Sequence, residues 1–430
     1  MTPTGLVAGA ASGKGKDAIR NLMGFMRLQA RLEGNRPTFS KFLGLSVSPT
    51  METETTRNGD KTNKAIVRED RFWFVGRSGG SSSSTTSTSS KHQEQEEHQE
   101  QQSLVFRYRF PPNNRLRHFD FDEIAHRRRG PNLATYTSIL DEVTTLSIIS
   151  AAQPNPRPGV SVTMQSQWGP GRADVEDGRP PPEEVDIVTT ITKTGRTLAF
   201  VRAEVHDPSN NDSLICYFDH VKYLPTGWML GLMLTPVGMW CLDLVLRYVV
   251  PSFRNNKESV SNSNSKNDDG HARIMDSFQQ TSDTTATFRW GPQHANGIGG
   301  LHGGVQAILM ERLGRTVAQN ELLKAANRTS NISNNKSSIH NNVECERLQV
   351  SYQSSASKVL ELRAHVIDPP AGEPPQCDAS SAVTLRIEIL RSGGPKSSSR
   401  DGGGPKEPGR VVVSEGILTF ANVSSKPKDQ

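Results

Sequence analysis

Residues 296–311 read Asn296-Gly-Ile-Gly-Gly-Leu-His302-Gly303-Gly304-Val-Gln-Ala-Ile-Leu-Met-Glu311. The histidine stands six positions after the asparagine, and the glutamate stands nine positions after the histidine. Beyond the glycine pair, apolar residues recur at helical spacing, at Val305, Ile308, Leu309 and Leu313. A glycine-rich turn that feeds a helix leaves backbone N–H groups free at the positive end of the helix dipole. Such a turn can cap an ordinary helix, or it can stabilise a carbonyl oxygen that becomes an oxyanion.

The composition limits the compact part of the chain and its possible partners. The chain has 430 residues, of which 34% are hydrophobic and 6% aromatic, and the deficit lies in a few polar tracts. The net charge is +5, but no stripe of Lys and Arg alternates with aromatic residues, so we expect no nucleic-acid partner. The four cysteines lack CxxC spacing, which favours a reducing compartment and argues against structural zinc. We expect no metal and no other cofactor.

The chain begins with a segment, residues 1–50, that we expect to hold a helix and the first strand of a domain. Residues 18–32 are amphipathic and carry three arginines with few acids. They form either a mitochondrial presequence or the helix before the strand at 39–47, and the second reading is favoured. The compartment therefore stays open between cytoplasm and mitochondrion.

Residues 51–103 are expected to be a low-complexity insertion. Its centre is a Ser/Thr run, 81–90, followed by a Gln/Glu/His tract, which cannot bury enough apolar area to order itself. Within the insertion, residues 71–75 either pack on the domain or add a strand to it.

Two later regions repeat one order of elements. In residues 104–225 a strand at 104–110 and a helix at 134–152 precede strands at 159–164, 184–192, 197–205 and 213–223. In residues 271–423 strands near 272–278 and at 284–290 precede a helix at 304–326. Strands then follow at 347–352, 359–367, 382–390 and 410–420, with disordered inserts at 327–342 and 392–408. A long helix followed by several antiparallel strands predicts a sheet wrapped around the helix.

Residues 226–270 join these regions as an apolar helical segment and a polar linker. The apolar run at 228–250 contains Pro236, which would break a membrane-spanning helix. Two short helices that pack on or between the domains are favoured, with peripheral membrane contact as an open possibility.

The motif at 296–311 resembles the signature of hotdog-fold acyl-CoA thioesterases: Asn, five residues, His-Gly-Gly, six residues, then Asp or Glu. The resemblance extends to acyl-CoA thioesterase 13-like and phenylacetate-type members, and the turn at 193–200 is similar to the family's hairpin. It implies an α+β fold with two tandem hotdog domains, each a long central helix wrapped by an antiparallel sheet, forming a pseudo-dimer. A further homodimer of such double hotdogs is possible.

The first of the two regions departs from the signature. Asp141 takes the place of the acid, but Asn132 stands where the family has histidine, and His126 stands where it has asparagine. Ser161 matches the family's serine that assists the water, whereas the second region has Cys345 at that place.

In this family each active site is built across two hotdog units. The resemblance therefore implies one intact site made of Asp141, Ser161, Asn296, His302 and Gly303. The reciprocal site would be degenerate and consist of Glu311, Asn132 and His126. The resemblance further implies substrate contacts from Gly304, and from His220 and Lys222, which either face the phosphates of coenzyme A or lie at a wet strand edge.

The implied reaction is hydrolysis of a fatty or aromatic acyl-CoA to the free acid and coenzyme A. The carbonyl oxygen would be held by the Gly303 N–H and the Asn296 amide, and one such donor lowers a barrier by about 3–4 kcal/mol. His302 would orient the turn or aid the leaving thiolate. Asp141, positioned by Ser161, would act as a general base or attack directly.

Three other functions compete with hydrolysis. A catalytically weak acyl-CoA-binding or regulatory protein is compatible with the loss of His-Gly-Gly in the first region. A hotdog hydratase would need an Asp/His pair that the sequence lacks at the required segment. A membrane-bound scaffold would rest on residues 228–250 alone.

Overall fold

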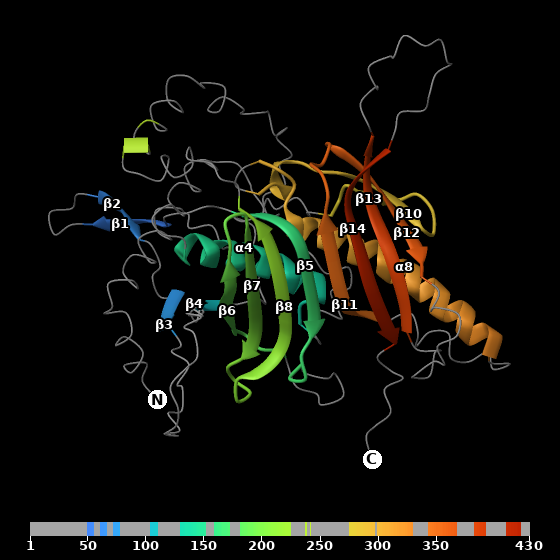
Figure 1. Ribbon diagram of the computed structural model, residues 1–430, viewed down its shortest axis with the longest axis horizontal. Coiled ribbons are helices and arrows are strands. Elements are labelled where there is room, and N and C mark those ends of the chain that lie inside the picture. Colours follow the sequence, from blue (N-terminus) through green and yellow to red (C-terminus); the bar gives the residue numbers. More distant parts are fainter. Residues whose placement is uncertain are drawn as a thin grey trace, which may run out of the picture.

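The computed structural model describes fourteen parts of the chain: 50–55, 61–66, 72–77, 104–110, 130–151, 159–172, 181–224, 237–238, 241, 275–296, 299–329, 343–367, 382–392 and 410–422. Two strands, β1 (Thr50–Thr55) and β2 (Lys61–Ile66), pair with each other in a small sheet of their own. The other strands described all belong to one large antiparallel sheet (Figure 1).

The large sheet has twelve strands in the order β3-β4-β6-β7-β8-β5-β11-β14-β13-β12-β10-β9. The first six in this order are β3 (Phe72–Arg77), β4 (Leu104–Phe110), β6 (Val185–Thr194), β7 (Leu198–Asp207), β8 (Ser213–Tyr223) and β5 (Val160–Trp168). The other six are β11 (Val343–Tyr352), β14 (Arg410–Asn422), β13 (Ala382–Ser392), β12 (Val359–Val366), β10 (Thr285–Arg289) and β9 (Phe278–Gln280). A short 3-10 helix, η7 (Pro292–His294), follows β10.

Strands β5 and β11 join the two runs of six at the centre of the sheet. Arg347 pairs with Gln167 and Ser351 pairs with Thr163, so the two strands cross in antiparallel register. In Figure 1 they lie side by side where the green strands meet the orange ones.

Helix α4 (Leu133–Ala151) packs against β5, β6, β7 and β8 and is buried on nearly all sides. Its N-terminus is capped by Asn132, whose Oδ1 accepts the Thr135 N–H at 2.8 Å. The polar face of the helix is satisfied internally, since Thr137 hydrogen-bonds Ser166 at 2.7 Å and Ser147 hydrogen-bonds Thr189 at 2.6 Å. Because most of its buried hydroxyls have partners, Thr135 Oγ1 being an exception among the described residues, the helix can lie inside the curve of the sheet.

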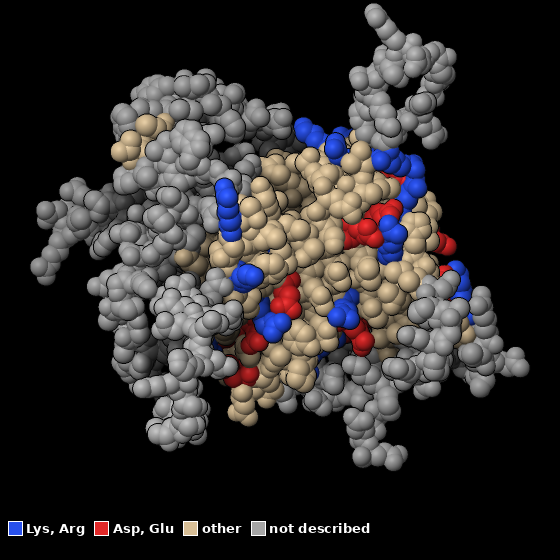
Figure 2. Space-filling model, in the orientation of Figure 1, with Lys and Arg blue, Asp and Glu red and all other residues tan. Residues whose placement is uncertain are grey.

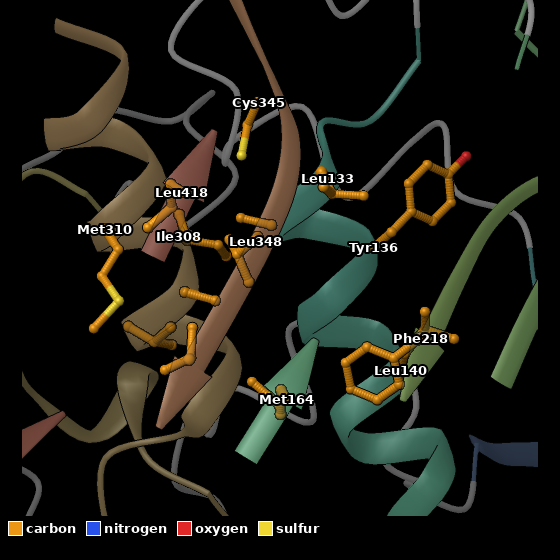
Figure 3. Close-up of a cluster of buried hydrophobic side chains, with 14 of the residues drawn as sticks. Leu133, Tyr136, Leu140, Met164, Phe218, Ile308, Met310, Cys345, Leu348 and Leu418 are labelled. Carbon is orange, nitrogen blue, oxygen red and sulfur yellow. The ribbon is translucent and has the colours of Figure 1, made fainter. Parts of the chain in front are cut away.

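Helix α8 (Gly303–Thr329) packs against β11, β12, β13 and β14, and it also contacts α4. The close-up in Figure 3 shows the apolar side chains between these elements. Leu133, Tyr136 and Leu140 come from α4, Ile308 and Met310 from α8, and Met164, Phe218, Leu348 and Leu418 from the strands. One continuous core therefore runs beneath the whole sheet.

The outer face of the sheet carries charges of both signs. In Figure 2 some of the visible Lys and Arg residues lie beside Asp and Glu residues, and others stand apart from them. Cross-strand ion pairs of this kind include Arg202–Asp219 and Arg386–Glu415. One sheet face thus packs on helices while the other meets water, as alternating burial along β7 also indicates.

Most elements expected from the sequence are present within a few residues of the expected bounds. One strand is wrong: residues 275–277 form a turn in which the Phe278 N–H donates to the Met275 carbonyl, and β9 begins only at Phe278. Of the two readings of residues 71–75, the added strand is correct, because β3 pairs with β4. The strands β1 and β2, inside the expected insertion, were not anticipated.

Several predictions fall outside the described residues. These are the helix at 18–32, the strand at 39–47, the Ser/Thr run at 81–90, most of the inserts at 327–342 and 392–408, and nearly all of 228–250. The starts of the two inserts were predicted wrongly, because residues 327–329 are the end of α8 and Ser392 is the last residue of β13. Among the helices that the structure describes, none has the length and apolarity needed to cross a bilayer.

Candidate active site

Asp141 lies in α4 with its carboxylate buried, and one of its oxygens has two donors. Oδ1 accepts from the Ser161 hydroxyl at 2.9 Å and from the Lys222 ammonium at 3.0 Å. The lysine also donates to the Ser161 Oγ at 3.2 Å. Ser161 and Lys222 are cross-strand partners on β5 and β8, so the sheet register delivers both groups to the same oxygen.

The other oxygen of Asp141 faces the start of α8. An ideal Cβ on Gly303 would lie 2.8 Å from Oδ2 and 3.0 Å from the Tyr352 Oη, so only glycine leaves this space open. The Tyr352 hydroxyl donates to the Gly303 carbonyl at 2.9 Å and fixes the turn from β11. As the first residue of α8, Gly303 has an N–H that meets no hydrogen-bond acceptor in the described part of the chain.

His302 connects the glycine turn to α4. Its Nδ1 accepts the Gly304 N–H at 2.9 Å, and its Nε2 lies 2.9 Å from the Glu142 Oε1. Because Nδ1 needs a lone pair for the first bond, the ring is a neutral imidazole that donates from Nε2 to Glu142. Burial opposes protonation of His302, but the hydrogen bond to Glu142 and the charges of Asp141 and Glu142 outweigh it and raise its pKa.

The groups around Asp141 keep it ionised. Burial alone would raise the pKa of this carboxyl, but the charge of Lys222 and its hydrogen bond to the carboxylate hold the pKa well below its ordinary value. His220 lies on the same face of β8 as Lys222, with its Nδ1 2.8 Å from the Thr144 Oγ1 and its Nε2 3.7 Å from the Asp141 Oδ1. Burial, followed by the charge of Lys222, lowers the pKa of His220 well below its ordinary value.

Asn296 lies in the tight turn that precedes the glycine pair. Its Oδ1 accepts the Gly300 N–H at 3.0 Å, and its backbone N–H donates to the Gly300 carbonyl at 2.7 Å. The Asn296 amide oxygen and backbone N–H therefore both take part in holding this turn.

The reciprocal place, at the start of α4, is occupied by Glu311. Its Oε2 accepts the Ala134 N–H at 2.8 Å, and its Oε1 pairs with Arg315 at 2.8 Å. Asn132 caps the same helix through the Thr135 N–H. His126 lies outside the described residues. Cys345 is buried, and burial followed by the charge of Glu311 raises the pKa of its thiol well above the ordinary value.

The expected position of His220 and Lys222 needs correction. Their side chains are 0% and 2% exposed, so neither lies at a wet strand edge. The Lys222 ammonium is engaged with Asp141 and Ser161, which leaves it facing the protein interior and not a phosphate in solvent. Gly304 packs on α4, since a Cβ there would lie 2.3 Å from the Ser138 Cβ, and its predicted contact with substrate stays a prediction.

The structure adds three contacts that the sequence interpretation did not include: Glu142 with His302, Tyr352 with Gly303, and Lys222 with Asp141. The contact of Lys222 with Asp141 was partly indicated by the sequence, because His220 and Lys222 are two positions apart and so lie on the same face of a strand. The first two join segments more than forty residues apart in sequence, and only the packing of the elements reveals them.

Within the described residues no group of three or more His, Cys, Asp and Glu side chains is arranged to hold a metal ion. No family model and no curated protein matches the chain.

Solved structures do resemble it. The chain is similar to a 12:0-ACP thioesterase from Umbellularia californica, at 12% identity and a TM-score of 0.38, over 74% of this chain and 94% of that one. It is similar to a protein with a hot dog fold from Alicyclobacillus acidocaldarius, at 8% identity and a TM-score of 0.33, over 74% and 92% of the two chains. A shorter similarity, to thioesterase superfamily member 2 from Mus musculus, has 20% identity and a TM-score of 0.21 over 29% and 75%.

The chain resembles hotdog-fold thioesterases.

Proposed function

We propose that this protein is an acyl-CoA thioesterase that hydrolyses fatty or aromatic acyl-CoA to the free acid and coenzyme A. The observation that carries the proposal is the closeness of the Asp141 carboxylate to Gly303 at the start of α8. An ideal Cβ on Gly303 would lie 2.8 Å from Asp141 Oδ2, and the Gly303 N–H meets no acceptor among the described residues. A carboxylate and an oxyanion donor on opposite sides of one small space are what hydrolysis of a thioester requires.

We further propose that the chain is a tandem hotdog whose halves form a pseudo-dimer with one composite site. Two features support this. Asp141 and Glu311 each stand nine positions after the residue that precedes their helix. The pairing of β5 with β11 is also symmetric, since Thr163 and Gln167 meet Ser351 and Arg347 as a two-fold axis would require.

The proposed reaction proceeds as follows. The thioester oxygen accepts hydrogen bonds from the Gly303 N–H and the Asn296 amide, and water attacks the carbonyl carbon while its proton passes to Asp141 Oδ2. The C–S bond then breaks, and the thiolate of coenzyme A leaves and takes up a proton. Ser161 holds Asp141 in place, and His302 supports the turn through Gly304.

General-base action by Asp141 is preferred to direct attack. An acyl-aspartate intermediate would leave the buried Lys222 without its counter-charge for the whole lifetime of the intermediate, whereas protonation of Asp141 does so only transiently. Single turnover in H₂¹⁸O is expected to place the label in the product acid, and label in Asp141 would assign direct attack instead.

We propose that the reciprocal site is inactive because its own acid fills it. Glu311 caps the Ala134 N–H, the donor at the place that Gly304 holds in the other helix, and Arg315 neutralises the carboxylate. The carboxylate and the helix end are thus paired with each other and not with a substrate.

The second candidate is a catalytically weak acyl-CoA-binding or regulatory protein. It is favoured by the strong pairing of Asp141 with Lys222, because a carboxylate with a depressed pKa is a weak base. Binding without turnover would not depend on Asp141.

The test is release of free thiol from a panel of acyl-CoA esters by wild type, Asp141→Asn and Glu311→Gln. We expect Asp141→Asn to lose roughly a hundredfold or more in kcat and Glu311→Gln to keep near-wild-type kcat. If only Glu311→Gln loses turnover, the assignment of the halves is reversed. If no ester is hydrolysed while acyl-CoA still binds, the regulatory function replaces the enzyme.

A further inference from the structure

Lys222 is a buried ammonium whose side chain is only 2% exposed. A charge in such a place is costly unless it is paired and hydrogen-bonded, and here its partners are Asp141 at 3.0 Å and Ser161 at 3.2 Å. The fold makes room for the side chain, because a Cβ on Gly159 would lie 2.7 Å from the Lys222 Cβ and 2.8 Å from its Cδ. The lysine therefore has a specific place in the interior, directly behind the acid.

We propose that Lys222 is a positioning residue for Asp141, and that it does not bind the phosphates of coenzyme A. This inference rests on the proposed thioesterase function. Lys222 and Ser161 both donate to Oδ1, so the carboxylate is anchored by one oxygen and presents Oδ2 to Gly303. Without the lysine the carboxylate can rotate, and the distance and angle to the reacting carbonyl are lost.

The other groups that face Asp141 cannot replace Lys222. His220, from the same strand, is kept neutral by burial, and His302 spends its Nδ1 on Gly304 and its Nε2 on Glu142. Tyr352, from β11, donates its hydroxyl to the Gly303 carbonyl. Of these groups, Lys222 is therefore the one that places a positive charge beside Asp141. Removing the Lys222 ammonium should raise the pKa of the Asp141 carboxyl.

The test compares two thioesters of one acyl group: the coenzyme A ester and the N-acetylcysteamine ester, which carries no phosphate. The variants are Lys222→Gln, which keeps a hydrogen-bond donor without the charge, and Lys222→Met, which removes both. The matched control is Lys193→Met, at an exposed lysine of the same sheet. Lys222→Gln is included because its amide can still bond Asp141 if the methionine variant fails to fold.

We expect kcat to fall roughly tenfold in Lys222→Gln and roughly a hundredfold in Lys222→Met, equally for both esters and with KM unchanged. The acid limb of the kcat profile should move to higher pH in Lys222→Gln, and Lys193→Met should behave as wild type. A rise in KM confined to the coenzyme A ester would overturn the inference in favour of phosphate binding. Wild-type kinetics in Lys222→Gln would also overturn it.

Failure of the proposed function gives a different result. In that case neither ester would be hydrolysed by wild type, or hydrolysis would persist in Asp141→Asn. If hydrolysis depends on Asp141 but not on Lys222, the proposed thioesterase function is supported and the positioning role of Lys222 is rejected.

Discussion

At the scale of single residues, the site is defined by the hydrogen bonds of two side chains, Asp141 and His302. Asp141 gives one oxygen to Ser161 and Lys222 and turns the other toward Gly303. His302 gives one nitrogen to Gly304 and the other to Glu142. These contacts hold two neighbouring side chains of α4, Asp141 and Glu142, against the glycine turn: Asp141 faces Gly303, and Glu142 bonds His302.

The Glu142–His302 pair leads to a prediction about pH. The neutral imidazole is the form that accepts the Gly304 N–H, so activity should rise with pH through the pKa of His302. Glu142 raises that pKa, and Glu142→Gln should therefore lower it and move the acid limb of kcat/KM to lower pH. The measurement is the pH–rate profile on one acyl-CoA.

The matched control for Glu142→Gln is Glu204→Gln, which breaks the more exposed Glu204–His206 pair at 3.2 Å. That variant should leave the acid limb where it is in wild type. An acid limb that does not move in Glu142→Gln would show that another group controls it.

At the scale of elements, the crossing of α4 and α8 brings the acid to the turn. The two glycines of the turn serve different purposes: Gly303 leaves space before Asp141, whereas Gly304 lets α8 approach Ser138 of α4. Substitutions at these neighbouring positions should therefore have different consequences.

Gly304→Ala is expected to destabilise the fold by about 1–3 kcal/mol, because its Cβ would lie 2.3 Å from Ser138 Cβ and 2.4 Å from Ser138 Cα. Urea unfolding measures this loss. Gly195→Ala is the control, since its nearest neighbour is an ordinary 3.4 Å away. Equal midpoints for the two variants would mean that the helices separate without cost at this crossing.

The elements were largely predictable because their patterns are local. The glycine pair and the apolar spacing after it indicated α8, and alternation indicated the long strands from β5 to β8. Ser161 and Asp141 followed from the resemblance and do lie 2.9 Å apart. What stayed hidden depends on register: Lys222 reaches Asp141 only because it is paired with Ser161 across two strands.

Helix α4 shows a second limit of sequence interpretation. A sequence gives no sign that polar residues of a helix are buried, yet Thr137, Ser138, Thr144 and Ser147 all are. Each donates to a backbone carbonyl one turn earlier or bonds a strand hydroxyl, so no water is needed. For the same reason Glu142, which would be a solvated carboxylate on an exposed face, is instead a buried partner of His302.

At the scale of the whole molecule, the two runs of six described strands are joined in the sheet by the pairing of β5 with β11, and α4 contacts α8 beneath it; we call this junction the seam. The acid and Ser161 come from one side of this seam, and the glycine turn comes from the other. Every group assigned to turnover therefore depends on the seam staying closed.

Because the pairing of β5 with β11 already holds the two halves together, the covalent link between them should not be needed for activity. Two separately produced polypeptides, cut between β8 and β9, should each be inactive and should recover thioester hydrolysis on mixing. Each would carry a bare sheet edge, β5 or β11, and could first pair with a copy of itself. The recovery should then be slow and limited by dissociation of those homotypic pairs, so that activity returns at a rate independent of protein concentration.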